Sequence, residues 1–400
     1  MKAGWESTTV GCLTEVVTKG TTPTSVGHSF TETGINFIKV ESLNEDGQFL
    51  ANKLAHISED CHQTLRRSQI KEGDILFSIA GALGRTAVVP ADIVPANTNQ
   101  ALSIIRLKND APIHRPFLVY ALSSGMLIEQ IEKARGGVAQ QNLSLAQVKA
   151  FNVPLPPLEE QQRIVAVLDD AFEGLARARA HAEANLQNVR ELFESIKANA
   201  LAYKGPDREE VILSEVSDIT SGLVDPREND YADMLHLGAG NMITGTDELV
   251  DVKTAREEKL KSGKYLFDET TILYSKIRPY LRKAARPDFQ GLCSADVYPL
   301  TPKPDRLDKD FLFHLLLGHD FTEYAISGSD RAGMPKVNRN HMFAYRFELP
   351  PIEAQRRIAT AIDEAHISCS ALVELANKKL QDLDDLRQSL LQKAFAGELT

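Results

Sequence analysis

One stretch of this chain occurs twice, and its repetition constrains the fold more than any other feature. The first copy reads LPPLEEQQRIVAVLDDA (155–171) and the second reads LPPIEAQRRIATAIDEA (349–365). The offset of 194 residues continues without a gap through the pattern that follows, so that Leu186 matches Leu380. A repeat of this length predicts a tandem of two similar units, each a globular part followed by a long helix.

Each copy has the features of a helix start. The proline pairs Pro156-Pro157 and Pro350-Pro351 suit a first helical turn, and acidic residues follow where the helix dipole favours negative charge. An apolar seam then recurs at steps of three and four residues for about five heptads, which predicts a coiled coil. The expected seam residues are Val165, Leu168, Phe172, Leu175, Leu186, Val189, Phe193, Ile196, Ile362, Val373, Leu380, Leu383 and Leu390.

Three polar residues interrupt this seam: Arg179, His366 and Arg387. They either lie at the edges of the seam and reach solvent, or they face aromatic rings. If the helices pair symmetrically in opposite directions, His366 lies near Phe193 and Arg387 near Phe172. Each ring would then accept a cation.

Composition narrows the class of protein. The four cysteines are scattered without a CxxC pair, which argues against a zinc site and a disulfide framework. The amino terminus does not resemble a signal peptide and no apolar run reaches membrane length, so we expect a cytoplasmic protein. The net charge is −10 and no segment is basic overall, so only local clusters of positive charge could bind nucleic acid.

The two globular parts have the same predicted plan. Residues 1–154 predict a mixed α/β domain with strands at 35–40, 74–80, 86–89 and 101–107, a helix at 116–133 and a Gly-rich turn, ARGGVAQQNLS. Residues 205–348 repeat this plan with looser identity: TTILYSKIRPYLRKAAR corresponds to GDILFSIAGALGRTAVV. A scaffold that repeats while its loops diverge favours two different recognition surfaces.

The order of these parts, together with the ending LLQKAFAGEL, resembles the specificity subunit of type I restriction-modification enzymes over essentially all 400 residues. The resemblance implies an α+β fold with two target-recognition domains, residues 1–154 and 205–348. Two long helices, residues 155–204 and 349–400, would pair antiparallel as a spacer with a pseudo-two-fold repeat. Each domain would read one half of a bipartite, asymmetric double-stranded DNA target.

The same resemblance implies that the chain is not itself an enzyme. It would direct two modification (methyltransferase) subunits and the restriction/translocase subunits, and S-adenosylmethionine, ATP and Mg²⁺ would bind to those partners. No catalytic residue, metal site or membrane contact is expected in this chain. Because both DNA and a pair of antiparallel units have an approximate two-fold axis, helix length would set the separation of the half-sites.

The strongest candidate for DNA contact is the stretch from 274 to 286, which holds five basic residues and no acid. Lysine and arginine can neutralise phosphates, and arginine can bind a guanine edge bidentately. The alternative is a solvated hairpin. Its candidate residues, with the one cation of the matching loop in the first unit, are Tyr274, Lys276, Arg278, Tyr280, Arg282, Lys283, Arg286 and Arg85.

Two further candidate segments are the Gly-rich turn before each long helix and the loop after the first long strand. Glutamine and asparagine amides suit adenine edges, and glycine lets the backbone approach phosphate. The alternatives are amides that cap the next element and an ordinary turn. The residues are Arg135, Gln141, Asn142, Arg331, Lys336, Asn338 and Arg339 in the turns, and Lys39, His236 and Asn241 in the loops.

Two other classes of function are weaker. An enzyme is disfavoured because the sequence has no P-loop, no GxGxxG and no HExxH; Asp247 with Glu257-x-Lys259 resembles a nuclease metal site only faintly. A coiled-coil scaffold without a DNA role fits the helices and the acidic charge. It does not explain why the globular parts repeat while the basic loop lies in only one of them.

Overall fold

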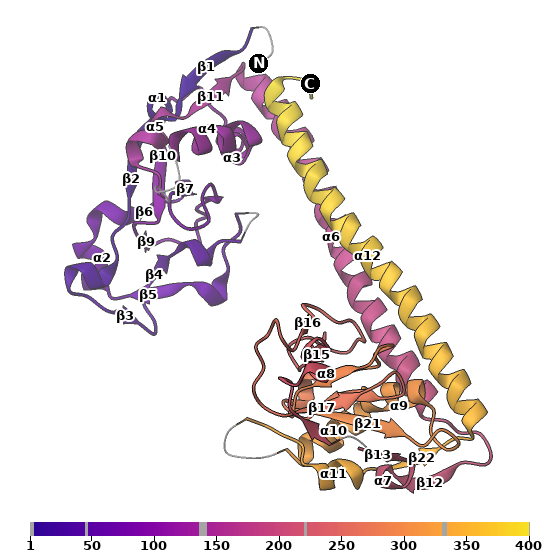
Figure 1. Cartoon of the computed structure of the whole chain (residues 1–400). Helices are drawn as coiled ribbons and strands as arrows, with labels where there is room; N and C mark the ends of the chain where they lie inside the picture. Colours follow the sequence, from indigo (N-terminus) through magenta and orange to yellow (C-terminus); the bar gives the residue numbers. More distant parts are fainter. Residues whose placement is uncertain (1–3, 45–46, 136–141, 220–221, 330–333, 400) are drawn as a thin grey trace. The chain divides into compact units, whose positions relative to one another are not determined.

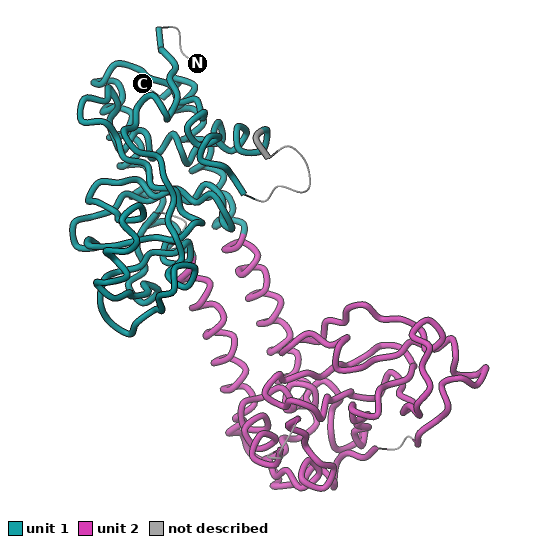
Figure 2. Tube along the Cα trace, turned by 90° about the vertical axis from the view of Figure 1, so that its left-hand side faces the viewer, with its two compact units in different colours: residues 1–182, 378–400 teal, residues 183–377 magenta. Residues whose placement is uncertain are grey.

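The computed structural model describes residues 4–44, 47–135, 142–219, 222–329 and 334–399. The chain divides into two compact units, residues 1–182 with 378–400 and residues 183–377 (Figure 2). Each unit holds one globular body and one end of each of two long helices. Within the described ranges, no helix has the length and apolar character needed to cross a membrane.

The body of unit 1 contains two sheets and a short strand pair (Figure 1). The four-stranded sheet has the order β2-β10-β7-β8, with strands Thr14–Lys19, Leu102–Leu107, Ile75–Ser78 and Thr86–Val88. The five-stranded sheet has the order β3-β5-β4-β9-β6, with strands Phe30–Thr31, Ala55–Ile57, Ile35–Ile38, Ala96–Thr98 and Gln69–Ile70. Strands β1 (Glu6–Thr9) and β11 (Asn152–Leu155) pair antiparallel before the first long helix. The four strands predicted for this body are therefore confirmed.

The body of unit 2 is built on the same plan. Its four-stranded sheet has the order β13-β21-β18-β19, with strands Ser217–Asp218, Val297–Pro302, Ile272–Ser275 and Ala284–Ala285. Its five-stranded sheet has the order β14-β17-β20-β15-β16, with strands Leu223–Val224, Lys264–Phe267, Gly291–Cys293, Leu235–Leu237 and Lys253–Thr254. Strands β12 (Glu209–Ile212) and β22 (Arg346–Leu349) pair as β1 and β11 do.

The two five-stranded sheets differ at their edges. The order β5-β4-β9-β6 matches β16-β15-β20-β17, and in each the central pair is parallel. The fifth strand lies at opposite ends: β3 adds beside β5, whereas β14 adds beside β17. The repeated scaffold is therefore confirmed, and the divergence lies at its margins.

The helix predicted at 116–133 is broken in two. Helix α3 (Arg115–Leu122) ends before Ser123-Ser124, and α4 (Gly125–Arg135) follows. The break redirects the chain so that Leu127 of α4 packs in the same core as Phe117 of α3. Unit 2 repeats the break between α9 (Lys309–Leu316) and α10 (His319–Ser327). The remaining short helices are α1 (Val10–Leu13), α2 (Glu59–Thr64), α5 (Leu145–Ala150), α7 (Leu213–Val216), α8 (Asn229–Ala232) and α11 (Arg339–Phe343).

Two long helices, α6 (Leu158–Leu201) and α12 (Ile352–Ala396), pass through both units. Within each unit they lie side by side and run in opposite directions (Figures 1 and 2). At 1.5 Å per residue each is about 65 Å long. Helix α12 ends at Gly397, whose φ of +80° is the left-handed conformation typical of a glycine helix stop.

The predicted seam residues are buried or half-buried in both helices. Val165, Leu168 and Phe172 belong to the core of unit 1, and Ile362 is fully buried in unit 2. The other nine are half-buried: Leu175, Leu186, Val189, Phe193, Ile196, Val373, Leu380, Leu383 and Leu390. This pattern is typical of a two-helix seam, which covers each residue from one side only.

Two of the three polar residues that interrupt the seam face aromatic rings, and the third lies at the edge of the seam. The guanidinium carbon of Arg387 lies 4.6 Å from the centroid of the Phe172 ring, and the His366 ring lies 5.3 Å from that of Phe193. The contacts predicted for these two residues are confirmed. Arg179 is exposed at the edge, where its Nη1 lies 2.6 Å from Asp384 Oδ1.

One buried glutamine joins each long helix to its body. Gln161 Nε2 donates to the carbonyl oxygens of Pro112 (3.1 Å) and Pro156 (2.8 Å), while its Oε1 accepts from the backbone N–H of His114 (2.7 Å). Gln355 makes the same three bonds 194 residues later, with Arg306, Pro350 and Asp308. Both glutamines are fully buried. The LPPxE-Q motif therefore fixes how each helix leaves its body.

Candidate nucleic-acid interface

The prediction that Tyr274 contacts DNA is wrong. Tyr274 lies in β18 and is 1% exposed, with its ring packed edge-on against Phe321 at 5.4 Å. Strand β18 runs between β21 and β19 and is buried on both faces, so alternate side chains do not reach solvent. Burial also raises the pKa of the Tyr274 hydroxyl above its ordinary value.

The β18–β19 loop (residues 276–283) is bound to the segment that follows the Gly-rich turn. The backbone N–H of Arg278 donates to the Pro335 carbonyl (2.9 Å), and that of Val337 donates to the Lys276 carbonyl (2.9 Å). Lys336 Nζ lies 2.8 Å from Asp296 Oδ1. The structure therefore brings two of the three candidate segments together.

Lys276 is used inside the body of unit 2. Its Nζ donates to the Ala295 carbonyl and lies 5.0 Å from the centroid of the Tyr298 ring. Burial lowers the pKa of Lys276, and the positive charge of Lys336 lowers it further. Lys276 is therefore engaged by contacts within the body and helps to shape the loop.

Three other cations of the predicted stretch anchor the loop and the strand after it. Arg282 Nη1 donates to Glu194 Oε2 on α6 (3.0 Å), and Lys283 Nζ donates to the Ala239 carbonyl (2.8 Å). Arg286 makes the largest network, with carboxylate oxygens at 2.7 to 3.1 Å. Its partners are Asp247, Asp310 and Asp363.

Asp363 lies at the centre of the Arg286 network, on α12. Burial alone would raise its pKa, but hydrogen bonds from His314 Nε2 (3.0 Å) and Arg286 outweigh burial and hold the pKa far below its usual range. The Arg286 guanidinium also lies 4.7 Å from the Phe313 ring centroid. This network links β19, α9, α12 and the 245–247 turn of unit 2.

The exposed candidates that remain in unit 2 are few. Arg278 and Tyr280 lie at the tip of the β18–β19 loop, and Tyr280 is 53% exposed. Arg339 is exposed, with its guanidinium 5.5 Å from the Phe343 ring centroid. Asn338 caps α11 by accepting from the backbone N–H of His341, as the capping alternative expects. Arg331 lies outside the described residues.

Unit 1 offers fewer charges at the corresponding positions. Arg85 Nη1 donates to the carbonyls of Val40 (3.2 Å) and Leu43 (2.6 Å), the same anchoring role that Lys283 has in unit 2. Lys39 is half-buried and lies 4.7 Å from the Phe30 ring centroid. Asn142 is exposed. Gln141 and the side chain of Arg135 lie outside the described part of the structure.

The loop candidates His236 and Asn241 serve the fold. His236 is buried with its Nδ1 2.9 Å from Glu258 Oε2, and burial lowers its pKa although Glu258 opposes this effect. Asn241 Oδ1 accepts from the backbone N–H of Gly238 (2.8 Å). His236 lies in strand β15 rather than in a loop and is buried, so the prediction that it contacts DNA is wrong. The alternative of an ordinary turn fits Asn241.

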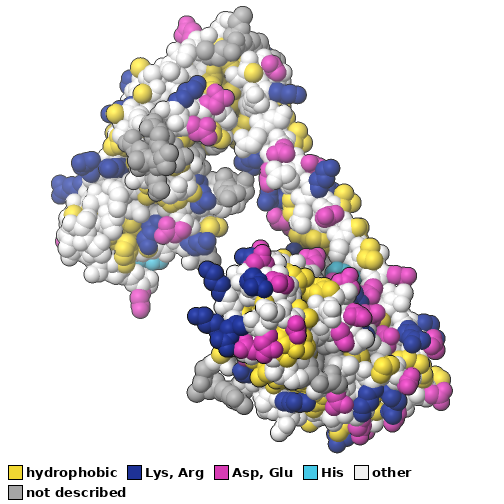
Figure 3. Space-filling model, viewed as in Figure 1, with side chains coloured by type: hydrophobic (Ala, Val, Ile, Leu, Met, Phe, Trp, Pro, Cys, Tyr) yellow, Lys and Arg dark blue, Asp and Glu magenta, His cyan; other side chains and the backbone are white. Residues whose placement is uncertain are grey.

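One group of cations was missed by the sequence reasoning. In unit 1 it lies between strands β5 and β6, and in unit 2 it extends from the first residue of β16 to the start of β17. These side chains are exposed and have no ion pair among the described residues: Arg66, Arg67, Lys253, Lys259 and Lys261. Figure 3 shows Lys and Arg side chains gathered on one side of the unit 2 body. In the sequence, neighbouring acidic residues formally cancel these positive charges. In the structure, Glu257 and Glu258 instead bond Thr254 and His236.

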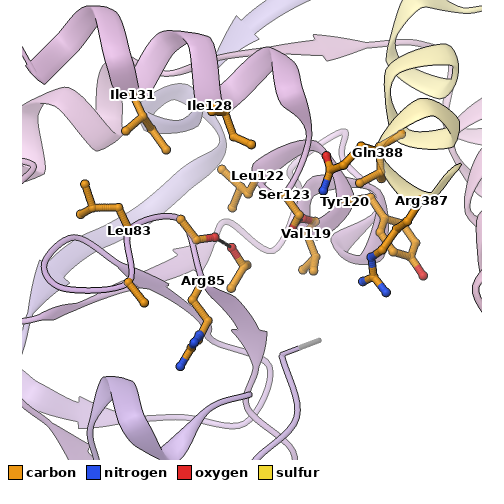
Figure 4. Close-up of a pocket in the computed structure, with 14 residues that line it drawn as sticks. Leu83, Arg85, Val119, Tyr120, Leu122, Ser123, Ile128, Ile131, Arg387 and Gln388 are labelled. Atoms are coloured by element: carbon orange, nitrogen blue, oxygen red, sulfur yellow. Dashed lines mark hydrogen bonds between the residues drawn. The ribbon is translucent and has the colours of Figure 1, made fainter. Parts of the chain in front are cut away.

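The junction between body and helices differs between the units. In unit 1 an open pocket of about 300 Å³ lies beneath the β7–β8 loop (Figure 4). Its walls include Val119, Tyr120, Ser123, Arg387 and Leu391. The positions 194 residues away line a cavity of only about 20 Å³ in unit 2: Phe313, His314, Leu317, Phe193 and Lys197. Phe313 and Leu317, which are larger than Val119 and Ser123, and the Arg286 network close the junction there.

The faint nuclease-like constellation is not assembled as a metal site. Asp247 bonds Arg286, and Glu257 accepts from the backbone and hydroxyl of Thr254. The segment around Glu257 is a series of turns rather than a helix. Within the described residues there is no group of three or more His, Cys, Asp or Glu side chains that could hold a metal ion.

Comparison with known proteins places this geometry in one family. A family model described as type I restriction modification DNA specificity domain matches residues 2–182 and 207–382. The EcoDI specificity subunit of Escherichia coli is 34% identical over 188 residues, which span 47% of this chain but only 41% of that subunit. The StySPI specificity subunit of Salmonella potsdam is 21% identical over 415 residues, covering 92% of this chain and 86% of the subunit.

Two solved structures share the fold. A chain from a study of complex assembly and conformational transition of the type I R-M system has a TM-score of 0.79 at 20% identity, covering 100% of this chain and 99% of that one. The HsdS subunit from Thermoanaerobacter tengcongensis has a TM-score of 0.61 at 20% identity, with 100% and 98% covered. Two matched segments, one in each unit, show that this chain belongs to the family of type I restriction-modification DNA specificity proteins.

Proposed function

We propose that this chain is the DNA-recognition subunit of a type I restriction-modification complex, and that each body reads one half of a bipartite, asymmetric target. One observation carries the proposal: two bodies with the same central strand order, attached by the same glutamine joint, present different side chains at matching loop positions. Both bodies also expose cations that have no ion pair within the described ranges in the same segment, which a pure scaffold does not require. The positive charge binds phosphate, and the divergent loops provide specificity.

In this proposal the chain positions DNA and catalyses nothing. Methyl transfer and cleavage belong to modification and restriction/translocase subunits, which would bind S-adenosylmethionine, ATP and Mg²⁺. The chain would act in the cytoplasm, where its DNA target lies. The long helices would set the number of base pairs between the half-sites.

Helix length provides the test of this proposal. Inserting one heptad into both α6 and α12 adds about 10 Å to each helix, or about three base pairs of DNA. We expect a methylated target with a longer spacer and unchanged half-sites. Sequencing of methylated positions in cells that express the chain with its modification subunit measures this.

The control is the same seven-residue insertion after Lys204, outside the helices, which should leave the spacer unchanged. A heptad variant that changed a half-site and kept the original spacer would contradict the proposal.

The long helices carry a surface that suits two copies of one partner. Leu192 on α6 is 52% exposed and Leu386 on α12 is 48% exposed, and these positions are related by the 194-residue offset. Each lies beside two half-buried seam residues, three positions before it and four after it, so each forms a small apolar patch on a helix surface. Two equivalent patches support a stoichiometry of two modification subunits per chain.

Charge placed in these patches should remove partner subunits one at a time. We expect Leu192→Glu and Leu386→Glu each to leave one modification subunit bound per chain, and the double variant to leave none. Native mass measurement of the purified complex reports the stoichiometry. Leu375→Glu is the control, because Leu375 is 63% exposed but its counterpart is His181. Loss of both subunits in every single variant would contradict two independent patches.

A further inference from the structure

The β18–β19 loop holds two arginines in a backbone conformation that disfavours them. Arg278 has φ 49° and ψ 62°, and Arg282 has φ 44° and ψ 57°. Both values lie in the left-handed region, where a Cβ atom crowds the following carbonyl oxygen and raises the free energy of the folded state. Two such residues within five positions are unusual for side chains other than glycine.

Unit 1 has glycine at the same two positions. Ser78 and Ser275 align the loops, because the backbone N–H of each bonds the carbonyl of the last loop residue, Arg85 or Lys283. The hydroxyl of each serine also donates to the carbonyl two residues later. The unit 2 loop is one residue longer. Counted from the serine, Arg278 corresponds to Gly81 (φ +75°), and counted back from the last loop residue, Arg282 corresponds to Gly84 (φ +83°). Unit 2 therefore accepts backbone strain that unit 1 avoids.

The fold explains only one of the two arginines. Arg282 bonds Glu194 on α6 and so holds the loop against the helix. Arg278 is exposed, and its guanidinium has no hydrogen bond or ion pair within the described residues. Its backbone is fixed nevertheless: its N–H donates to Pro335 and its carbonyl accepts from Leu281 at 2.9 Å. The loop therefore holds, at a strained position fixed by backbone hydrogen bonds, a guanidinium that no contact with the described part of the body uses.

We propose that Arg278 is a specificity-determining residue that binds the edge of a guanine in the half-site read by unit 2, with Tyr280 packed beside it on the DNA. This inference rests on the proposed function. A phosphate requires only positive charge, which a lysine or arginine at an unstrained position of the loop would supply. A base edge requires a fixed orientation, and the guanidinium fork matches the O6 and N7 atoms of guanine. Base reading therefore explains why an arginine is kept at this strained but fixed backbone position.

The glycine variant separates this role from a structural one. For Arg278→Gly we expect the unfolding midpoint of unit 2 to stay the same or rise, because the left-handed backbone is relieved. Binding of the complex to its target duplex should fall by about 10- to 100-fold. Methylation mapping should show one guanine position of the unit 2 half-site becoming degenerate. Arg278→Lys keeps the charge and should relax the same position. Arg306→Ala, on the same body but paired with Glu209, is the control and should change neither readout.

Each outcome decides the inference. Equal loss of affinity for target and random duplex, with a salt dependence weaker by about one phosphate contact, would replace base reading by phosphate binding. An unchanged target with unchanged affinity would overturn the inference and leave the proposed function intact. A wild-type complex with no specific methylated target would overturn both.

Discussion

Replacing Arg286 by methionine is expected to lower the free energy of unfolding of unit 2 by about 3 kcal/mol. Methionine keeps part of the side-chain volume but removes the guanidinium that bonds three carboxylates from different elements. Hydrogen exchange across a urea series measures the loss in unit 2 separately from unit 1. Arg306→Met is the matched control, because Arg306 is a surface cation whose side chain pairs with the exposed Glu209, and its effect should stay within about 0.5 kcal/mol.

A second substitution tests whether the loss arises because the Asp363 carboxylate no longer has the Arg286 guanidinium as its partner. Adding Asp363→Asn to Arg286→Met should recover part of the loss, because a neutral amide does not need the guanidinium. The depressed pKa of Asp363 means that its stabilisation is present above the unfolded value, about pH 4, and is lost as the pH falls below it. Wild-type unit 2 should therefore weaken below about pH 4, and Asp363→Asn should reduce that slope. Equal losses in the single and double variants would contradict this account.

Gln161→Ala is expected to destabilise unit 1 by about 3 kcal/mol. The substitution leaves one backbone N–H and two carbonyl oxygens without their partner in a fully buried site, and it opens a cavity beside them. Gln355→Ala should have the same effect in unit 2, because its three bonds are the same. Hydrogen exchange in the first turn of α6 or α12 measures the local loss.

The neighbouring Gln162 provides the control for this joint. Gln162 is exposed on the same helical turn, so Gln162→Ala should change stability by less than about 0.5 kcal/mol. A loss of the same size for Gln161→Ala and Gln162→Ala would show that helix content, rather than the buried amide, fixes the joint.

The long helices and the central strands could be predicted because their signals are local. A heptad seam and short β-branched runs are determined by residues close in sequence, and both repeat in the two units. The contacts of Arg387 and His366 with rings followed from the offset and an antiparallel pairing alone. The buried glutamines were present in both copies of LPPxE-Q, and their identity at matched positions was the signal that could have found them.

The candidate site was harder to predict because its charges are cancelled from far away. Arg286 meets Asp363, 77 residues later, and Arg282 meets Glu194, 88 residues earlier. A run of cations in the sequence therefore predicts a DNA-binding loop. Only the tertiary contacts show which of these cations bond carboxylates of the protein itself. Tyr274 failed for a related reason: a strand buried on both faces does not expose every second residue. The break between α3 and α4 after Leu122 could not be predicted, because no proline lies at that position.

Because the same glutamine joint attaches both bodies to the long helices, we expect that either body can replace the other. The two replacements should differ in their effect on stability. A body moved from the second position to the first would bring Arg286 towards Asp169, the counterpart of Asp363, where Tyr120 now donates its hydroxyl. The reverse move would place Val88, the strand partner of Ile75 and counterpart of Arg286, against Asp363, leaving that carboxylate without its guanidinium. Permuted chains built this way should tolerate two copies of the second body better than two copies of the first.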